Sequence, residues 1–206
     1  DRSILEGFAQ GPHEVAVATF FHRNKDLPEF VRPFRIMHHR LAAYPDGYMG
    51  SRIGWVRAIQ YRRDEKRAIG ILKGWIQDWN PDLVFASWTI TAGYIAAKAG
   101  ANPLALYPWG SDVLYLPQKR AWYRRRSVEA LRGAAMWVCN ARHTGERARE
   151  LSGSDARIEV LPCEVDAGVF NPACADRSLF DKLWPEKKVV MSTRPLRDLY
   201  NPETIV

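Results

Sequence analysis

The sequence predicts an α/β fold in which a parallel β-sheet is covered by helices on both faces. Three observations favour this fold: short apolar runs recur along the chain, segments with helical spacing separate them, and glycines or prolines bound several of them. The chain has 206 residues, of which 47% are hydrophobic and 12% aromatic, which is enough for one sizeable core. This composition is typical of a globular rather than a disordered chain.

The first 80 residues predict one strand and one long helical region. Residues 13–21, HEVAVATFF, follow a Gly-Pro pair and are β-rich, after which the aromatic-rich segment 31–52 has an irregular pattern. From 54 to 78, apolar residues recur at helical spacing between arginines and lysines, and Asn80-Pro81 ends the pattern. We therefore expect a strand, a loop, and then amphipathic helix in one piece or two.

Strands and helices alternate regularly from residue 81. Buried strands are predicted at 81–88, 103–109, 135–141 and 156–163. Helices are predicted between them at 91–101, 118–133 and 142–153, the last closed by Gly153. Because helices of this length separate the strands, we expect the strands to be parallel and covered on both faces.

The pattern changes after residue 164, which predicts a domain boundary. Residues 166–187 have no obvious periodicity and carry two prolines, and a new apolar strand, VVMSTR, follows at 189–194. We predict a first domain over 1–165, a linker over 166–187, and the start of a second domain over 188–206. The chain begins with Asp1 rather than Met and ends in a helix-like segment, so we expect a fragment cut at both ends.

The charge of the chain favours an anionic partner. Formal net charge is +7, and basic residues gather in Arg62-Arg63 and in QKRAWYRRR at 118–126. Phosphates, acidic lipid headgroups and nucleic acid are anionic partners that would suit this charge. The alternative for each cluster is a solvated helix face that binds no partner. No RRM, KH or zinc-finger pattern is visible, so a nucleic-acid partner is not expected.

The cysteines and histidines indicate which cellular compartment and which metal sites to expect. Cys139, Cys163 and Cys174 form neither a CxxC pair nor an even set, which favours a reducing compartment and a cytoplasmic location. His38-His39 has no metal-ligand spacing, so no metal site is expected. No run approaches the roughly 20 apolar residues of a membrane-spanning helix, and we expect a soluble chain.

Polar and aromatic residues follow three of the predicted strands, where an open parallel sheet binds its ligands. They are Ser87, Trp88 and Thr89 after the first, Trp109, Gly110, Ser111 and Asp112 after the second, and Asn140 after the third. Gly110 would let a ligand approach the backbone, and Ser111 and Asp112 can hydrogen-bond hydroxyls. The alternative is that Ser111 or Asp112 only caps the following helix.

Four segments carry a family resemblance through their order and spacing: PDLVFASW, AKAGANPLALYPWGSDVL, ALRGAAMWVCNA and RIEVLPCEVDAGVFNP. They resemble the acceptor-side half of glycosyltransferase family 4 enzymes. Val165-Asp166 and Phe170-Asn171-Pro172 are similar to the family's linker pattern, with Glu164 in place of its glycine. Residues 189–205 resemble the first strand and loop of the donor-binding half, so the resemblance extends from about residue 80 to the end.

The resemblance implies the GT-B architecture, in which two Rossmann-like domains face each other across a cleft. It also implies transfer of a hexosyl group from a nucleotide-diphosphate sugar to a glycan or to a phosphorylated or lipid-linked acceptor, with retention and with no cofactor or metal. Arg194 stands where the family has a phosphate-contacting arginine, which suits a leaving diphosphate. Arg197 is the candidate to replace the lysine that usually follows.

The same resemblance suggests roles at the strand ends. Trp109 stands nearest the place of a family histidine that contacts the donor sugar, which makes Asp112 the candidate catalytic contact to a sugar hydroxyl. Trp109, Gly110, Ser111, Trp88 and Asn140 are the candidate substrate-binding residues. The family's glycine-rich loop and paired glutamates would lie before Asp1 and after Val206, so we expect the fragment alone to be inactive.

Several alternatives stay open. The basic segment 118–126 suits a phosphate-bearing acceptor or peripheral docking on the inner face of an anionic membrane, or is an exposed helix with Trp122 and Tyr123 packed inward. A non-catalytic module that binds a glycan or a nucleotide has the same fold, as does a sugar-nucleotide epimerase. A nucleic-acid-binding α/β domain would show steeply salt-dependent binding to single strands.

Overall fold

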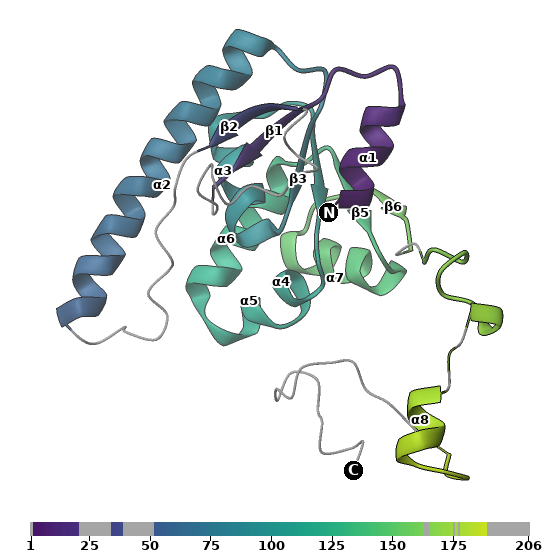
Figure 1. Ribbon diagram of the computed structural model, residues 1–206. Helices are drawn as coiled ribbons and strands as arrows, with labels where there is room; N and C mark the ends of the chain where they lie inside the picture. The colour runs from purple at the N-terminus through teal and green to yellow at the C-terminus, as the bar shows by residue number, and fades with distance from the viewer. Residues whose placement is uncertain are drawn as a thin grey trace. The chain divides into compact units, whose positions relative to one another are not determined.

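The computed structural model describes residues 2–20, 34–38, 52–162, 165–174, 176 and 178–188. The chain divides into two compact units, residues 1–162 and 163–206, and the first contains every described strand (Figure 1). The predicted strand at 189–194, and with it the second domain, lies outside the described residues. The predicted division into two domains and a linker therefore stays a prediction.

A four-stranded parallel sheet forms the centre of the first unit. Its strands are β3 (Val84–Ser87), β4 (Leu104–Tyr107), β5 (Met136–Cys139) and β6 (Arg157–Val160), in the order β3-β4-β5-β6. Each lies within one of the four strands predicted from residue 81 onward. The short apolar runs bounded by glycine, proline or asparagine are therefore a sufficient signal for these strands.

Helices cover both faces of this sheet, which confirms the predicted fold class. On one face, the paired residues Ala86, Leu106, Trp137 and Ile158 form a row across the four strands. This row meets helices α3 (Tyr94–Ala99), α6 (Ala121–Gly133) and α7 (Arg142–Ser152). Trp137, for example, donates its indole N–H to the Leu131 carbonyl of α6 at 3.2 Å.

The opposite face carries aromatic side chains, because neighbouring residues of a strand point to opposite sides. Phe85 and Tyr107 stack there with ring centroids 6.1 Å apart. Phe8, from helix α1 (Arg2–Gln10), meets Phe85 edge-on at 5.9 Å. Helix α1 was not among the predicted helices, although Leu5 and Phe8 have helical spacing.

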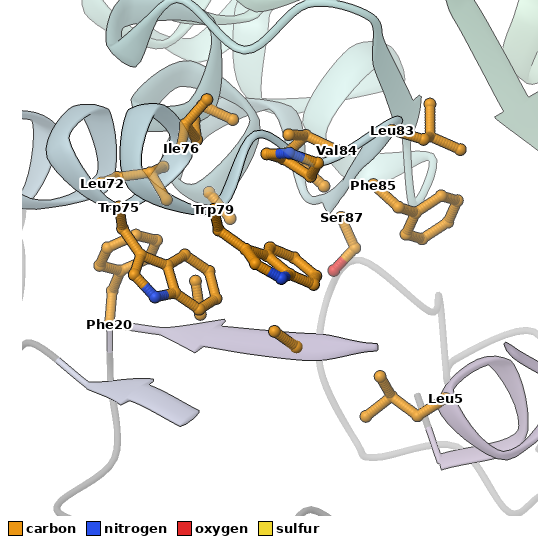
Figure 2. Close-up of a pocket in the computed structure, with 16 residues that line it drawn as sticks. Leu5, Phe20, Leu72, Trp75, Ile76, Trp79, Leu83, Val84, Phe85 and Ser87 are labelled. Atoms are coloured by element: carbon orange, nitrogen blue, oxygen red, sulfur yellow. The ribbon is translucent and has the colours of Figure 1, made fainter. Parts of the chain in front are cut away.

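The first strands form a sheet of their own. Strand β1 (Ala16–Thr19) lies within the predicted strand 13–21 and pairs in parallel with β2 (Arg35–His38). The prediction that segment 31–52 is irregular was wrong for β2, whose only apolar residues, Ile36 and Met37, stand between Arg35 and His38. A cavity of about 270 Å³ lies between β1 and β3, and Figure 2 shows Trp75 and Trp79 pointing into it.

The amphipathic region is one continuous helix, α2 (Arg52–Trp79), which settles the open choice between one helix and two. Its side chains Tyr61, Ala68 and Leu72 are buried in the core. Arginines and lysines on its other faces are exposed, as at Arg63 and Arg67. This division of faces follows from the helical period of the apolar residues.

The helix predicted over 118–133 differs from the observed structure. Two helices share this part of the chain, the end of α5 (Leu116–Lys119) and α6, and a further short helix, α4 (Ser111–Leu114), precedes them. Arg120 interrupts them with extended backbone angles, φ −152° and ψ 140°. Pro117 opens α5, a position that proline favours, but no residue type marks the break at Arg120.

The second unit contains short helices where the sequence shows no periodicity. A 3₁₀ helix, η5 (Pro172–Cys174), and a helix, α8 (Ser178–Leu183), are described in it. In the linker pattern, the Asp166 carboxylate accepts hydrogen bonds from the backbone N–H groups of Gly168 and Val169 at 2.9 and 3.3 Å. Asp166 therefore stabilises a turn, which is a common use of aspartate.

Among the helices of the described residues, none combines the length and the apolar character that crossing a bilayer requires.

Candidate functional site

The carboxyl ends of β3, β4 and β5 lie beside one another at one edge of the sheet. The pairing of β3 with β4 and of β4 with β5 fixes this order. Trp88 and Thr89 directly follow β3, residues 109–112 follow β4 after Pro108, and Asn140 follows β5. The structure thus brings the sequence-predicted residues of three separate segments to one edge.

The Asp112 carboxylate joins the first two strand ends. It is fully buried, and its Oδ2 accepts a hydrogen bond from the Thr89 backbone N–H at 2.7 Å. Its Oδ1 accepts one from the Trp109 backbone N–H at 2.9 Å. Since both oxygens are engaged below the surface, this carboxylate holds the two loops together.

Two hydroxyl groups hold the backbone of the same residue. The Asp112 carbonyl accepts hydrogen bonds from the Ser127 hydroxyl at 2.8 Å and from the Thr89 hydroxyl at 3.3 Å. The oxygens of these two hydroxyls lie 3.1 Å apart. Ser127 was missed by the sequence analysis, because nothing distinguishes a serine inside a basic helix until its partner, 15 residues away, is known.

The helix-capping alternative is wrong for both Ser111 and Asp112. Gly110 is the N-cap of α4, and this helix has no side-chain capping hydrogen bond. Asp112 bonds backward to Trp109 instead of forward into its own helix. Its carboxylate therefore bonds the strand ends and does not cap α4, the helix that contains it.

Unusual backbone conformations occur at both strand ends. Trp88 has φ 68° and ψ 102°, which is rare for a residue with a bulky side chain, and the π-helix η4 (Thr89–Gly93) begins directly after it. Gly110 has φ 96° and ψ −64°. Strained residues and π-turns concentrate at functional sites, because surrounding contacts must hold them in place.

Gly110→Ala should lower the free energy of unfolding by roughly 1–3 kcal/mol, because a residue with a Cβ rarely adopts its positive φ. Space is not the reason, since an added Cβ would meet only Leu114 Cδ1, at 3.7 Å. The matched control is Gly70→Ala in α2, where a Cβ meets nothing within 4 Å. This control should gain about 0.5–1 kcal/mol from helix propensity. Urea unfolding of both variants measures the difference, and a neutral Gly110→Ala would contradict the backbone argument.

An aromatic surface stands above the buried carboxylate. Trp88 and Trp109 meet edge-on with ring centroids 6.2 Å apart, and Trp109 is 50% exposed. Ser111 and Asn140 are half-buried, and the Asn140 Oδ1 accepts a hydrogen bond from the Thr144 hydroxyl at 3.4 Å. An exposed indole ring beside small polar groups can pack against the apolar face of a sugar and bond its hydroxyls.

Burial governs the two ionisable groups beneath this surface. It raises the pKa of the Asp112 carboxyl, and the hydrogen bonds from Thr89 and Trp109 oppose that rise. Burial, and secondarily the nearby charge of Asp112, raises the pKa of the Cys139 thiol to about 11. Cys139 is therefore a packing residue rather than a nucleophile at neutral pH.

Helix α6 supports the strand ends through a second residue that the sequence analysis missed. Arg126 is 2% exposed, its Nε donates to the Ile90 carbonyl at 2.6 Å, and it forms an ion pair with Glu65 of α2. Trp122 and Tyr123 are half-buried, which agrees with the interpretation of segment 118–126 as an exposed helix with these two side chains packed inward. Arg126 differs from that interpretation, because its side chain is buried in the core. A run of arginines gives no signal for which of them is buried.

Other predicted functional residues cannot be placed at this site. Arg194, Arg197 and His39 lie outside the described residues, and the side chain of His38 is not described. In the part of the chain that the structure describes, no three histidine, cysteine, aspartate or glutamate side chains group in a way that could hold a metal ion.

Comparison with known proteins identifies the family. No curated protein matches the chain. A family model described as glycosyl transferase 4-like domain matches residues 2–164, which include all six described strands and the strand-end site. The match and the parallel α/β fold agree with the resemblance found in the sequence, and the chain therefore belongs to the glycosyl transferase 4-like family.

Proposed function

We propose that this chain is the acceptor-side part of a retaining glycosyltransferase that uses a nucleotide-diphosphate sugar. It moves a hexosyl group to a glycan or to a phosphorylated or lipid-linked acceptor, without a metal or other cofactor. The observation that carries the proposal is the Asp112 carboxylate, which ties the backbones of Thr89 and Trp109 together at the edge where Trp88 meets Trp109. Membership of the family supports sugar transfer in general.

The proposed roles follow from exposure and hydrogen bonding. Trp109, which is half exposed, packs against a sugar ring, and Ser111 and Asn140 bond its hydroxyls. Gly110 gives the ligand close access to the backbone, because no side chain stands there. Asp112 is a positioning residue in this proposal rather than a sugar contact, since its carboxylate is buried and both oxygens are engaged.

The donor side of the proposal rests on residues outside those described. Arg194 and Arg197 neutralise the leaving diphosphate, where negative charge accumulates during transfer. The enzyme works in the cytoplasm, and the exposed basic residues of α2 and α6 allow it to dock on an anionic membrane surface. Anionic lipid also suits an acceptor that is itself held in the membrane.

The test is turnover by the protein expressed with its complete native reading frame. Uridine and guanosine diphosphate sugars are supplied with lipid-linked and soluble glycan acceptors, and release of nucleoside diphosphate is followed. Trp109→Ala should lower turnover at least about tenfold, equivalent to about 1.4 kcal/mol of transition-state stabilisation. Its unfolding midpoint should change little, because half of the side chain is already exposed. Proton NMR of the product reads the anomeric configuration.

Leu83→Ala is the matched control. Leu83 is 44% exposed and lies at the amino end of β3, away from the strand-end site, so turnover should be unchanged. Equal effects of the two substitutions would contradict the proposed role of Trp109. Glycan binding without turnover of any nucleotide sugar would instead identify a non-catalytic module.

A further inference from the structure

A second cavity lies on the helical side of the first unit. It has a volume of about 490 Å³, within the range of small-molecule sites, and is formed by α2, α3 and α6. Aromatic side chains from all three helices form its walls, namely Tyr61, Tyr94 and Trp122. This cavity is separate from the strand-end residues, none of which lines it.

The lining of the cavity is strongly basic. Five cationic side chains and one carboxylate line it: Arg62, Lys66, Lys98, Arg125, Arg126 and Glu65. Glu65 is already paired with the buried Arg126. Lys98 and Arg125 share Glu129, at 2.5 and 3.3 Å. The local charge is therefore positive even after every observed ion pair is formed.

Arg62 and Lys66 provide the uncompensated charge. Both are exposed on α2, and within the described residues neither forms an ion pair. They are four residues apart, so they lie one above the other on the same face of the helix. Two like charges at this spacing repel each other, and an anion held between them relieves the repulsion.

Arg126 shapes the wall of the cavity and does not itself bind the ligand. Its guanidinium lies 3.8 Å from the ring centroid of Tyr94 and 4.4 Å from that of Trp122. Its Nε already donates to the Ile90 carbonyl, and its Nη2 is engaged with Glu65. These contacts hold the aromatic side chains in place, while the exposed side chains of Arg62 and Lys66 stay available to a ligand.

We infer that this cavity binds a phosphate group through Arg62 and Lys66, with Tyr94 and Trp122 packing against the apolar part of the molecule that carries it. The ligand class is a phosphate ester or a diphosphate, since arginine binds such oxygens in a bidentate manner and lysine as a point charge. The inference rests on the helical cavity alone and does not depend on the transfer reaction.

Binding of pyrophosphate to the full chain tests the inference. The double variant Arg62→Ala/Lys66→Ala should raise the dissociation constant at least about tenfold, because it removes both charge-assisted contacts. The matched control, Arg63→Ala/Arg67→Ala, removes the same charge at the same spacing from exposed positions of α2 that do not line the cavity. It should change the constant less than about twofold. Circular dichroism of both variants confirms that α2 is intact.

Vesicles distinguish the two sources of phosphate. Flotation with phosphatidylglycerol vesicles, against phosphatidylcholine vesicles, measures binding of a lipid headgroup. A difference between the two double variants that appears with pyrophosphate alone assigns the cavity to a soluble phosphate compound. A difference that appears with phosphatidylglycerol alone assigns it to a lipid headgroup, and both results support the inference.

Two results would overturn it. Equal weakening by the two double variants would mean that diffuse positive charge, rather than this cavity, attracts the anion. Absence of binding to both pyrophosphate and phosphatidylglycerol vesicles would mean that the cavity has no phosphate ligand. A protein that fails both tests but turns over nucleotide sugars would leave the proposed transferase function intact.

Discussion

Replacing Arg126 with Met should lower the free energy of unfolding by about 3–5 kcal/mol, the range for breaking one partner of a buried ion pair. Arg126 is 2% exposed, and the Glu65 carboxylate would remain largely buried without its partner. The Ile90 carbonyl would also lose its hydrogen-bond donor. Urea unfolding measures the loss, with the slope of the transition checked for two-state behaviour.

A double-mutant cycle separates charge from packing at this pair. Glu65→Met/Arg126→Met removes both charges together and should recover most of the stability, because an apolar pair needs no compensation in the core. Arg125→Met is the matched control: its side chain is 69% exposed and it pairs with Glu129 near the surface, so it should cost less than about 1 kcal/mol. Equal losses in the single and double variants would locate the effect in the stacking of Arg126 on Tyr94 and Trp122.

Asp112→Ala should lower the free energy of unfolding by at least about 1–3 kcal/mol, the cost of leaving one buried N–H group without an acceptor, with a smaller addition from a second, part-buried N–H group. Those groups belong to Thr89 and Trp109, so the loss should be accompanied by a change in Trp109 fluorescence. Asp82→Ala is the control, because this aspartate is exposed just before β3 and should change stability by less than about 0.5 kcal/mol. A loss no larger than that of the control would contradict the role of Asp112 in holding the strand ends.

The pH dependence of Asp112 has a definite sign. Burial raises its pKa above 3.8, so the folded protein binds this proton more tightly than the unfolded chain does. The resulting stability is fully present below pH 3.8 and is lost as the pH rises through the raised pKa. The stability of the wild type relative to Asp112→Asn should therefore fall over this interval. A constant difference would mean that the two hydrogen bonds cancel the effect of burial.

The sheet was predictable from the sequence, because segments with helical spacing separate its strands and glycine, proline or asparagine residues bound these segments. Gly153, for example, closes α7 in a left-handed conformation, φ 65°, as its place after the helical pattern predicted. Strand β2 was missed because only two of its residues, Ile36 and Met37, are apolar, and helix α1 because a short terminal helix carries too little periodicity.

The meeting of the strand-end residues at one edge of the sheet was predictable, but their hydrogen-bond partners were not. The placement of Trp88 and Trp109 follows from the parallel pairing of β3 and β4, whose carboxyl ends meet at one edge of the sheet. The burial of Asp112 depends on Thr89, 23 residues earlier, and that of Arg126 on Glu65, 61 residues earlier. Such partners are known only once the chain has folded, so composition and spacing gave no reason to separate these residues from their exposed neighbours.

The π-helix after β3 makes the segment between Trp88 and Tyr94 a spacer of fixed length. Its first residues are tied to Asp112 through Thr89 and to Arg126 through Ile90, and its far end places the Tyr94 ring against the same guanidinium. Removing one residue would rotate everything beyond it by the turn of one helical residue, which is about 100° in an α-helix and less in the wider π-helix. Insertions and deletions between 88 and 94 would therefore uncouple the strand-end site from the helical cavity, so homologues that keep both sites should align through this segment without gaps.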